Sequence, residues 1–178
     1  MHRNLAAPGS GEELHPDLLA ARKLVYDPCG FDHTAPQKET ESRGYGAYSF
    51  ELNGSAVRFR VAKITPTKIG QFVVLWKRVG NGPIQPYDMS DHVDFMIIST
   101  RKGDDFGQFV IPKSVLCAQD IVSSNGRGGK RAIRVYPPWD NVTSRHAENT
   151  QRWQSDCFLP IPQVTLPDFD RARQLFRQ

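Results

Sequence analysis

The stretch YGAYSFELNGSAVRFRVAKI, residues 45–64, carries the strongest secondary-structure signal of the chain. Apolar and polar residues alternate from Tyr48 to Leu52 and again from Val57 to Val61. Asn53 and Gly54 stand between the two runs, and this dipeptide is typical of a two-residue hairpin turn. The sequence therefore predicts a β-hairpin with one apolar face.

The next stretch, TPTKIGQFVVLWKR at residues 65–78, favours a helix over residues 66–78. Thr65 suits the N-cap and Pro66 the first helical position. The helical spacing is carried by Ile69, Phe72, Val73 and Trp76. Because Val73 and Val74 are β-branched, a strand is the alternative for this stretch.

The remaining elements complete an α+β domain. A helix is expected over Pro16–Val25, HVDFMIIST (92–100) reads as a central strand, and RKGDD turns it into FGQFVIP (106–112). A short helix after Pro112, a strand in AIRVYPPW (132–139) and a helix capped by Ser144 follow. This order predicts a single layered domain with a central mixed sheet flanked by helices.

We divide the chain into a flexible leader (1–12), one domain (13–160) and a loosely packed, proline-rich tail with a short basic helix (161–178). The three widely spaced cysteines fit reduced thiols rather than a disulfide or zinc framework. No apolar run suits a signal peptide or a membrane span. We therefore expect a cytoplasmic protein with no membrane partner.

Positive charge is concentrated in two segments. The net charge is +4 and the pI about 9.1. No acidic residue occurs between Glu51 and Asp88 or between Asp120 and Asp140. The glycine-rich stretch SSNGRGGKR (123–131) suits phosphate oxygens, with a solvated loop as the alternative. The predicted nucleic-acid-binding residues are Lys63, Lys68, Lys77, Arg78, Arg127, Lys130, Arg131 and Arg134.

Asp94 and the following hairpin partly match the metal-dependent nucleases of the PD-(D/E)XK type. Such enzymes place one acid on a strand and an acid-x-lysine on its partner to hold Mg²⁺ and activate hydroxide. A turn within residues 100–105 would place Gln108 opposite or diagonal to Asp94, but Gln108 and Val110 replace the acid and the lysine. The sequence therefore predicts a degenerate motif. In the simpler interpretation, Asp94 is a structural residue that caps a backbone group.

Two alternatives stay open. A divergent Mg²⁺-dependent nuclease could combine Asp94 with Glu51 and a migrated lysine, with Lys63, Gln108 and Lys113 as further candidates. Lys63 could instead pair with a buried acid. A protein-interaction module is the other alternative. Outside the nuclease reading no cofactor or metal is expected, and no catalytic residue is assigned.

The strings YGAYSFELNG, FRVAKITPTKIGQFVVLWKR, FGQFVIPKSVL, GKRAIRVYPPWD and TQRWQ together resemble the MepB family of small bacterial proteins. The resemblance covers Glu41 to Leu159. It implies a restriction-endonuclease-like fold and nucleic-acid binding, and it carries no established catalytic residues. The preferred hypothesis is a non-catalytic nucleic-acid-binding protein, with DNA as the expected partner and a homodimer possible.

Overall fold

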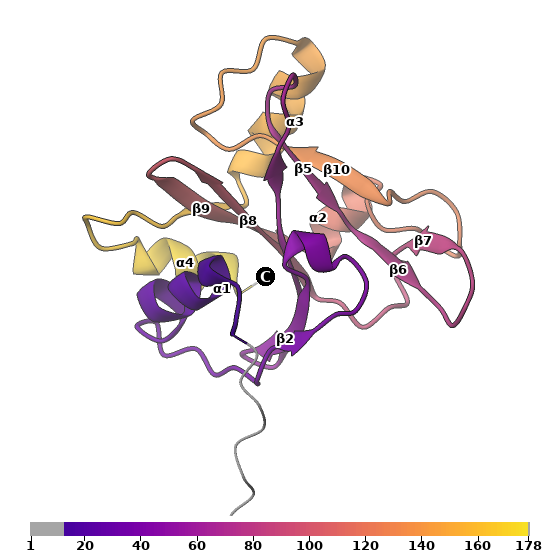
Figure 1. The fold of residues 1–178 in the computed structure, drawn as a ribbon, viewed down its shortest axis with the longest axis horizontal. Coiled ribbons are helices and arrows are strands. Elements are labelled where there is room, and N and C mark those ends of the chain that lie inside the picture. Colours follow the sequence, from indigo (N-terminus) through magenta and orange to yellow (C-terminus); the bar gives the residue numbers. More distant parts are fainter. Residues whose placement is uncertain (1–12, 178) are drawn as a thin grey trace, which may run out of the picture.

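A mixed six-stranded sheet forms the centre of the molecule (Figure 1). The computed structural model describes residues 13–177, so the predicted leader lies outside the described part. The strand order is β1-β2-β3-β8-β9-β11, and only β3 and β8 pair in parallel. The strands are β1 Gln37–Lys38, β2 Tyr48–Leu52, β3 Ser55–Val61, β8 Phe95–Lys102, β9 Asp105–Pro112 and β11 Phe158–Pro160. The predicted α+β class with a central mixed sheet is confirmed.

The hairpin of β2 and β3 forms as predicted. Leu52 pairs with Ser55, which leaves Asn53 and Gly54 as the two turn residues. Both have positive φ, 50° and 77°, a conformation that asparagine and glycine adopt at low cost.

Helices and a smaller sheet cover the two faces of the central sheet. The first core lies under α1 (Pro16–Ala21), its π-helical continuation (Arg22–Tyr26) and α4 (Phe169–Leu175). The second core lies under α2 (Lys113–Ala118), α3 (Arg145–Ser155) and the small sheet. Strands β8 and β9 are buried on both faces, which explains their continuous apolar sequences.

The predicted helix over residues 66–78 is wrong. This segment forms β5 (Gln71–Val74) and β6 (Trp76–Arg78). The small sheet has the order β10-β5-β4, with β4 at Lys63–Ile64 and β10 at Ala132–Val135, and β6 pairs with β7 (Ile84–Pro86). Pairing with a strand about sixty residues away overrides the local helical spacing. The segment therefore forms the strand that its β-branched residues left as the alternative.

The C-terminal segment packs more tightly than predicted. The expected basic helix is α4, which Asp168 caps by accepting a hydrogen bond from the Arg171 amide. Its residues Ala172 and Leu175, with Phe176 beyond them, are buried in the first core. The tail is therefore part of the packed unit, because its apolar face covers the sheet beside α1.

The other predicted elements are present. Helix α2 follows Pro112, β10 lies within the expected strand, and the Ser144 hydroxyl accepts a hydrogen bond from the Ala147 amide at the start of α3. A 3₁₀ turn at Arg43–Tyr45 precedes β2. Among residues 13–177, no helix has the length and apolar character needed to cross a bilayer.

Candidate nucleic-acid interface

The residues of the degenerate nuclease motif do not meet. Gln108 lies opposite Ser99, whereas Phe95, the neighbour of Asp94, lies opposite Pro112. The expected juxtaposition of Asp94 and Gln108 is therefore wrong, because the turn is tight and the hairpin pairs along its whole length. Gln108 is fully buried and accepts a hydrogen bond from the Tyr26 hydroxyl at 2.6 Å.

Asp94 has the structural role that the sequence left open. Its Oδ2 accepts a hydrogen bond from the Ala56 amide at 2.7 Å, at the point where β8 joins β3. Its backbone amide donates to the Ala56 carbonyl, and its carbonyl accepts from the Lys113 amide. The carboxylate thus extends the ladder between the strands by one position.

The sheet nevertheless brings three of the nuclease candidates into one row. Glu51 lies opposite Ala56, which binds Asp94, and Asp94 binds the backbone of Lys113. Adjacent strands lie about 4.8 Å apart, so Glu51 and Asp94 start about 10 Å apart. No group of three or more acidic, histidine or cysteine residues within 13–177 is arranged to hold a metal.

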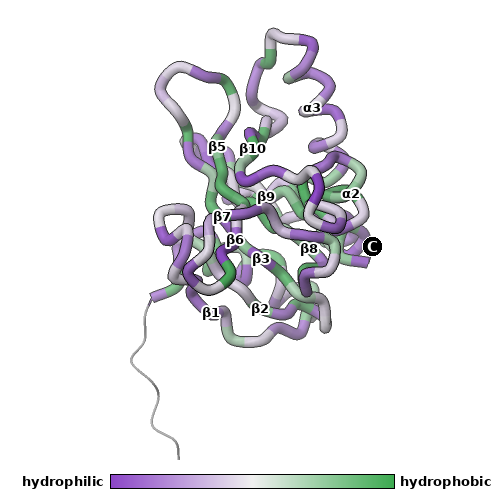
Figure 2. The backbone as a smooth tube through the Cα atoms, turned by 90° about the vertical axis from the view of Figure 1, so that its right-hand side faces the viewer, coloured by the Kyte–Doolittle hydropathy of each residue, from purple (hydrophilic) through white to green (hydrophobic). Residues whose placement is uncertain are grey.

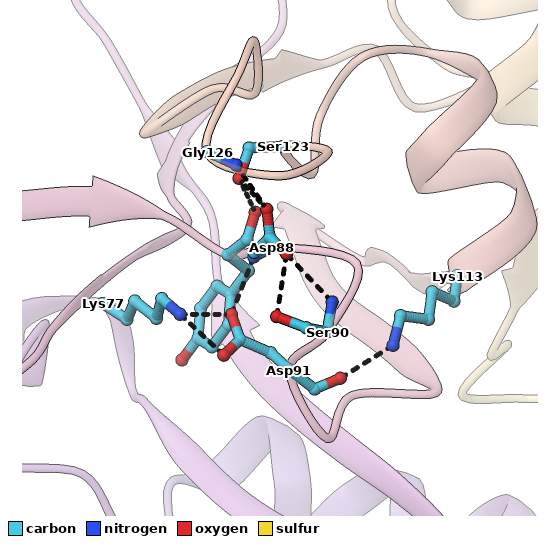
Figure 3. A network of polar contacts seen from close by, with 8 residues as sticks. Lys77, Asp88, Ser90, Asp91, Lys113, Ser123 and Gly126 are labelled. Carbon is cyan, nitrogen blue, oxygen red and sulfur yellow. Dashed lines mark hydrogen bonds and ion pairs between the residues drawn. The ribbon is translucent and has the colours of Figure 1, made fainter.

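Two of the predicted nucleic-acid-binding cations, Lys77 and Arg78, have acidic partners, and the nuclease candidate Lys113 donates to a backbone carbonyl. Lys77 Nζ lies 2.6 Å from Asp91 Oδ1, and Lys113 Nζ donates to the Asp91 carbonyl at 2.7 Å (Figure 3). Arg78 Nε lies 3.1 Å from Glu41 Oε1. The acids come from segments outside the acid-free stretches, so folding supplies the missing negative charge.

The glycine-rich loop is held by carboxylates. Asp88 Oδ1 accepts from the Ser123 hydroxyl and the Gly126 amide, while Oδ2 accepts from Ser90 (Figure 3). These hydrogen bonds hold the pKa of Asp88 well below its usual range, and the bond from the Ser90 amide has the largest effect. Asp120 accepts from the Gly129 amide. The amides of Gly126 and Gly129 are thus occupied by carboxylates and are not free to donate to a phosphate.

The remaining predicted cations differ in their surroundings. Lys63 Nζ lies 4.4 Å above the Tyr45 ring and has no acidic partner among the described residues. Arg134 Nη1 donates to Thr65 Oγ1 at 3.0 Å and to the Gly70 carbonyl at 3.2 Å. Among the predicted cations, those whose side chains have no ion pair, hydrogen bond or ring contact within residues 13–177 are Lys68, Arg127, Lys130 and Arg131.

Two adjoining cavities, of about 430 and 270 Å³, form what we call the β10 groove. Both are lined by Arg134 and Tyr136, so they meet above β10. Lys68 lines the first cavity and Lys130 the second. The other lining residues are Thr67, Ile69, Gln119, Ile121, Ala132, Ile133, Val142, Thr143, Ser144, His146, Ala147, Thr150, Trp153 and Gln154. None of these residues is acidic.

The loop of residues 65–70 forms one wall of the groove, and the segment leading into α3 forms the other. Figure 2 shows both rising at the same end of the molecule. Gly70 has a φ of 82°, and a Cβ there would lie 2.7 Å from the Tyr136 ring. The glycine therefore allows the loop to pack directly on Tyr136, while Arg134 holds it by hydrogen bonds.

Sequence reasoning missed the part of the groove that α3 contributes. His146, Thr150 and Trp153 follow one another at helical spacing, and this spacing was the available signal. Trp153 is half-buried against the second core, as expected for a core tryptophan, and it also lines the groove.

Comparison with known proteins places this geometry in a family. A family model described as MepB-like matches residues 39–160. The chain belongs to the MepB-like family. The solved "Crystal Structure of MepB" resembles this MepB-like chain with a TM-score of 0.69 and 33% sequence identity, covering 72% of this chain and 86% of the other. No curated protein matches the chain. The family match contains β2 to β11 and the β10 groove, and it ends before α4.

Proposed function

We propose that this MepB-like protein binds nucleic acid in the β10 groove, with DNA as the partner to be tested first. The observation that carries the proposal is the lining of the groove, where Lys68, Arg134 and Lys130 follow one another and no carboxylate is present. Phosphates are bound by such a series of cations, and Tyr136 and Trp153 offer ring faces to bases.

The proposal includes a restriction-endonuclease-like architecture without cleavage chemistry. The mixed sheet with helices on both faces is compatible with that architecture. Gln108 lies away from Asp94 and is neutral, buried and bound to Tyr26, so it offers no metal ligand. Binding without hydrolysis is the function that these residues support best.

The test is a fluorescence-anisotropy titration of labelled duplex DNA, single-stranded DNA and RNA at several salt concentrations. Binding should weaken steeply with salt, with a log–log slope near 0.9 for each duplex phosphate neutralised or about 0.7 for a single strand. Absence of binding to every probe at low salt would refute the proposal and leave the protein-interaction module as the function to pursue.

The row of Glu51, Asp94 and Lys113 supports a second candidate, a divergent Mg²⁺-dependent nuclease. Glu51 and Asp94 would supply oxygen ligands and Lys113 the ammonium. The same samples should therefore be incubated with divalent cations and examined for shortened strands. Metal-dependent cleavage that is lost in Asp94→Asn, which keeps an oxygen acceptor for the Ala56 amide, would replace binding by catalysis as the function.

A further inference from the structure

A second cleft, the Gln71 cleft, shares part of its wall with the β10 groove. It has a volume of about 420 Å³ and is lined by the loop 64–70, Gln71, Lys102, Asp140 and Asn141. Residues 67–69 of the loop also line the groove. The two hollows are therefore neighbours, and Lys68 borders both.

One buried acceptor in this cleft, Gln71 Oε1, lacks a donor, and a second side chain, that of Asp140, has a single partner among the described residues. Gln71 is 1% exposed; its Nε2 donates to the Arg101 carbonyl at 3.3 Å, and its Oε1 is buried with no partner among the described residues. The Asp140 side chain is 7% exposed, and its one partner there is Lys102 Nζ at 3.5 Å. Buried acceptors are nearly always satisfied, so Gln71 Oε1 is open to a donor from outside the chain, and the Asp140 carboxylate can accept hydrogen bonds beyond its one ion pair.

The lysines restrict what that donor can be. Lys68 and Lys102 border the same cleft and disfavour a purely cationic ligand. A ligand that suits all four side chains presents hydrogen-bond donors to Asp140 and Gln71 and an acceptor or anion to the lysines. The guanine edge does so, because its N1–H and N2 amino group are adjacent donors and O6 is an acceptor.

We propose that the Gln71 cleft binds a guanine base. The two oxygens of the Asp140 carboxylate accept from N1–H and the N2 amino group, Gln71 Oε1 takes a remaining amino hydrogen, and Lys102 donates to O6. Lys68 is placed for the attached phosphate. The base could come from a free guanosine nucleotide or from a strand in the β10 groove, and only the second source rests on the proposed function.

The first test uses the unaltered protein and three labelled oligonucleotides, namely oligo-dA, the same strand with one central dG, and that strand with deoxyinosine in place of dG. Deoxyinosine keeps O6 and N1–H but lacks the N2 amino group. The dG strand should bind about ten-fold or more tightly than both others, as expected for a bidentate base contact. Equal affinity of the three strands would overturn the base site while leaving groove binding intact.

One substitution in the Gln71 cleft should change its preference from guanine to xanthine. Asp140→Asn converts one carboxylate oxygen into an N–H donor, and xanthine carries a carbonyl at the position of the guanine amino group. This variant should lose the preference for guanine and gain one for xanthine, a change that a purely structural role would not produce. Asp104→Asn, an exposed acid without a partner among residues 13–177, is the control and should keep the preference for guanine.

The source of the base is decided with mononucleotides. GMP, AMP and XMP are added separately, and the shift in thermal unfolding temperature is recorded. Stabilisation by GMP alone, without binding of any strand, would support the cleft as a site for free nucleotides and refute the proposed function. Failure of both the strands and GMP to bind would refute both proposals.

Discussion

The Tyr26 hydroxyl donates a 2.6 Å hydrogen bond to Gln108 Oε1 beneath the first helix. Both residues are fully buried, and burial raises the pKa of Tyr26, which keeps the phenol neutral. Position 108 is therefore a packing position of the first core and not a solvent-facing ligand.

Tyr26→Phe should lower the free energy of unfolding by about 1–3 kcal/mol, because Gln108 Oε1 would remain buried without a donor. Tyr45→Phe is the matched control, since no hydrogen bond of the Tyr45 hydroxyl occurs within residues 13–177, and it should change stability by less than about 0.5 kcal/mol. Urea unfolding measures both. Equal effects of the two substitutions would contradict the structural role of this hydrogen bond.

Gly70→Ala should destabilise the protein and distort the β10 groove. The alanine would have a φ of 82° and its Cβ would lie 2.7 Å from the Tyr136 ring. Gly103→Ala is the control, because Gly103 also has a positive φ but a Cβ there meets nothing within 4 Å. Gly103→Ala should lose only the stability that a left-handed alanine backbone costs, about 1–2 kcal/mol. Thermal unfolding should show a larger loss of stability for Gly70→Ala. Equal losses would indicate that the Tyr136 ring and the Val135 carbonyl, 2.8 Å from the same Cβ, accommodate the methyl group without cost.

Asp88 should make stability depend on acidity. Its folded-state pKa lies below the ordinary value of 3.8 because Ser90, Ser123 and Gly126 donate hydrogen bonds to the carboxylate. A depressed pKa stabilises the folded state above the unfolded-state pKa, and this contribution is lost as the pH falls from about 4 through the folded-state pKa.

Unfolding free energies of Asp88→Asn and the unaltered protein, measured from neutral pH to about pH 2, should converge in acid. Asp104→Asn serves as the control and should follow the unaltered protein throughout, since Asp104 has no partner among the described residues. A constant gap between Asp88→Asn and the unaltered protein at every pH would refute the role of the Asp88 charge.

The sequence predicted those elements whose signal is local. The Asn53-Gly54 turn, the doubly buried strands β8 and β9 and the Ser144 cap each follow from a few adjacent residues. Strand β5 could not be predicted in this way, because its partner β10 lies far along the chain and the same residues fit a helix.

The candidate site was predicted only in part for the same reason. Lys68, Lys130 and Arg134 were predicted and line the β10 groove. Lys77 and Arg78 were predicted with them, but Asp91 and Glu41 reach them through the fold. A count of charges along a segment does not show which acids the fold brings to it.

The most direct test of nucleic-acid binding in the β10 groove compares Lys68→Glu and Lys130→Glu with Lys23→Glu. Lys23 is an exposed lysine on the π-helical turn over the first core, away from the groove lining. Both groove variants should bind labelled DNA more weakly, with a salt slope lower by about 0.7–0.9 for each lost phosphate contact, and Lys23→Glu should match the unaltered protein. Equal binding by all four proteins, or an equal loss in Lys23→Glu, would contradict the account.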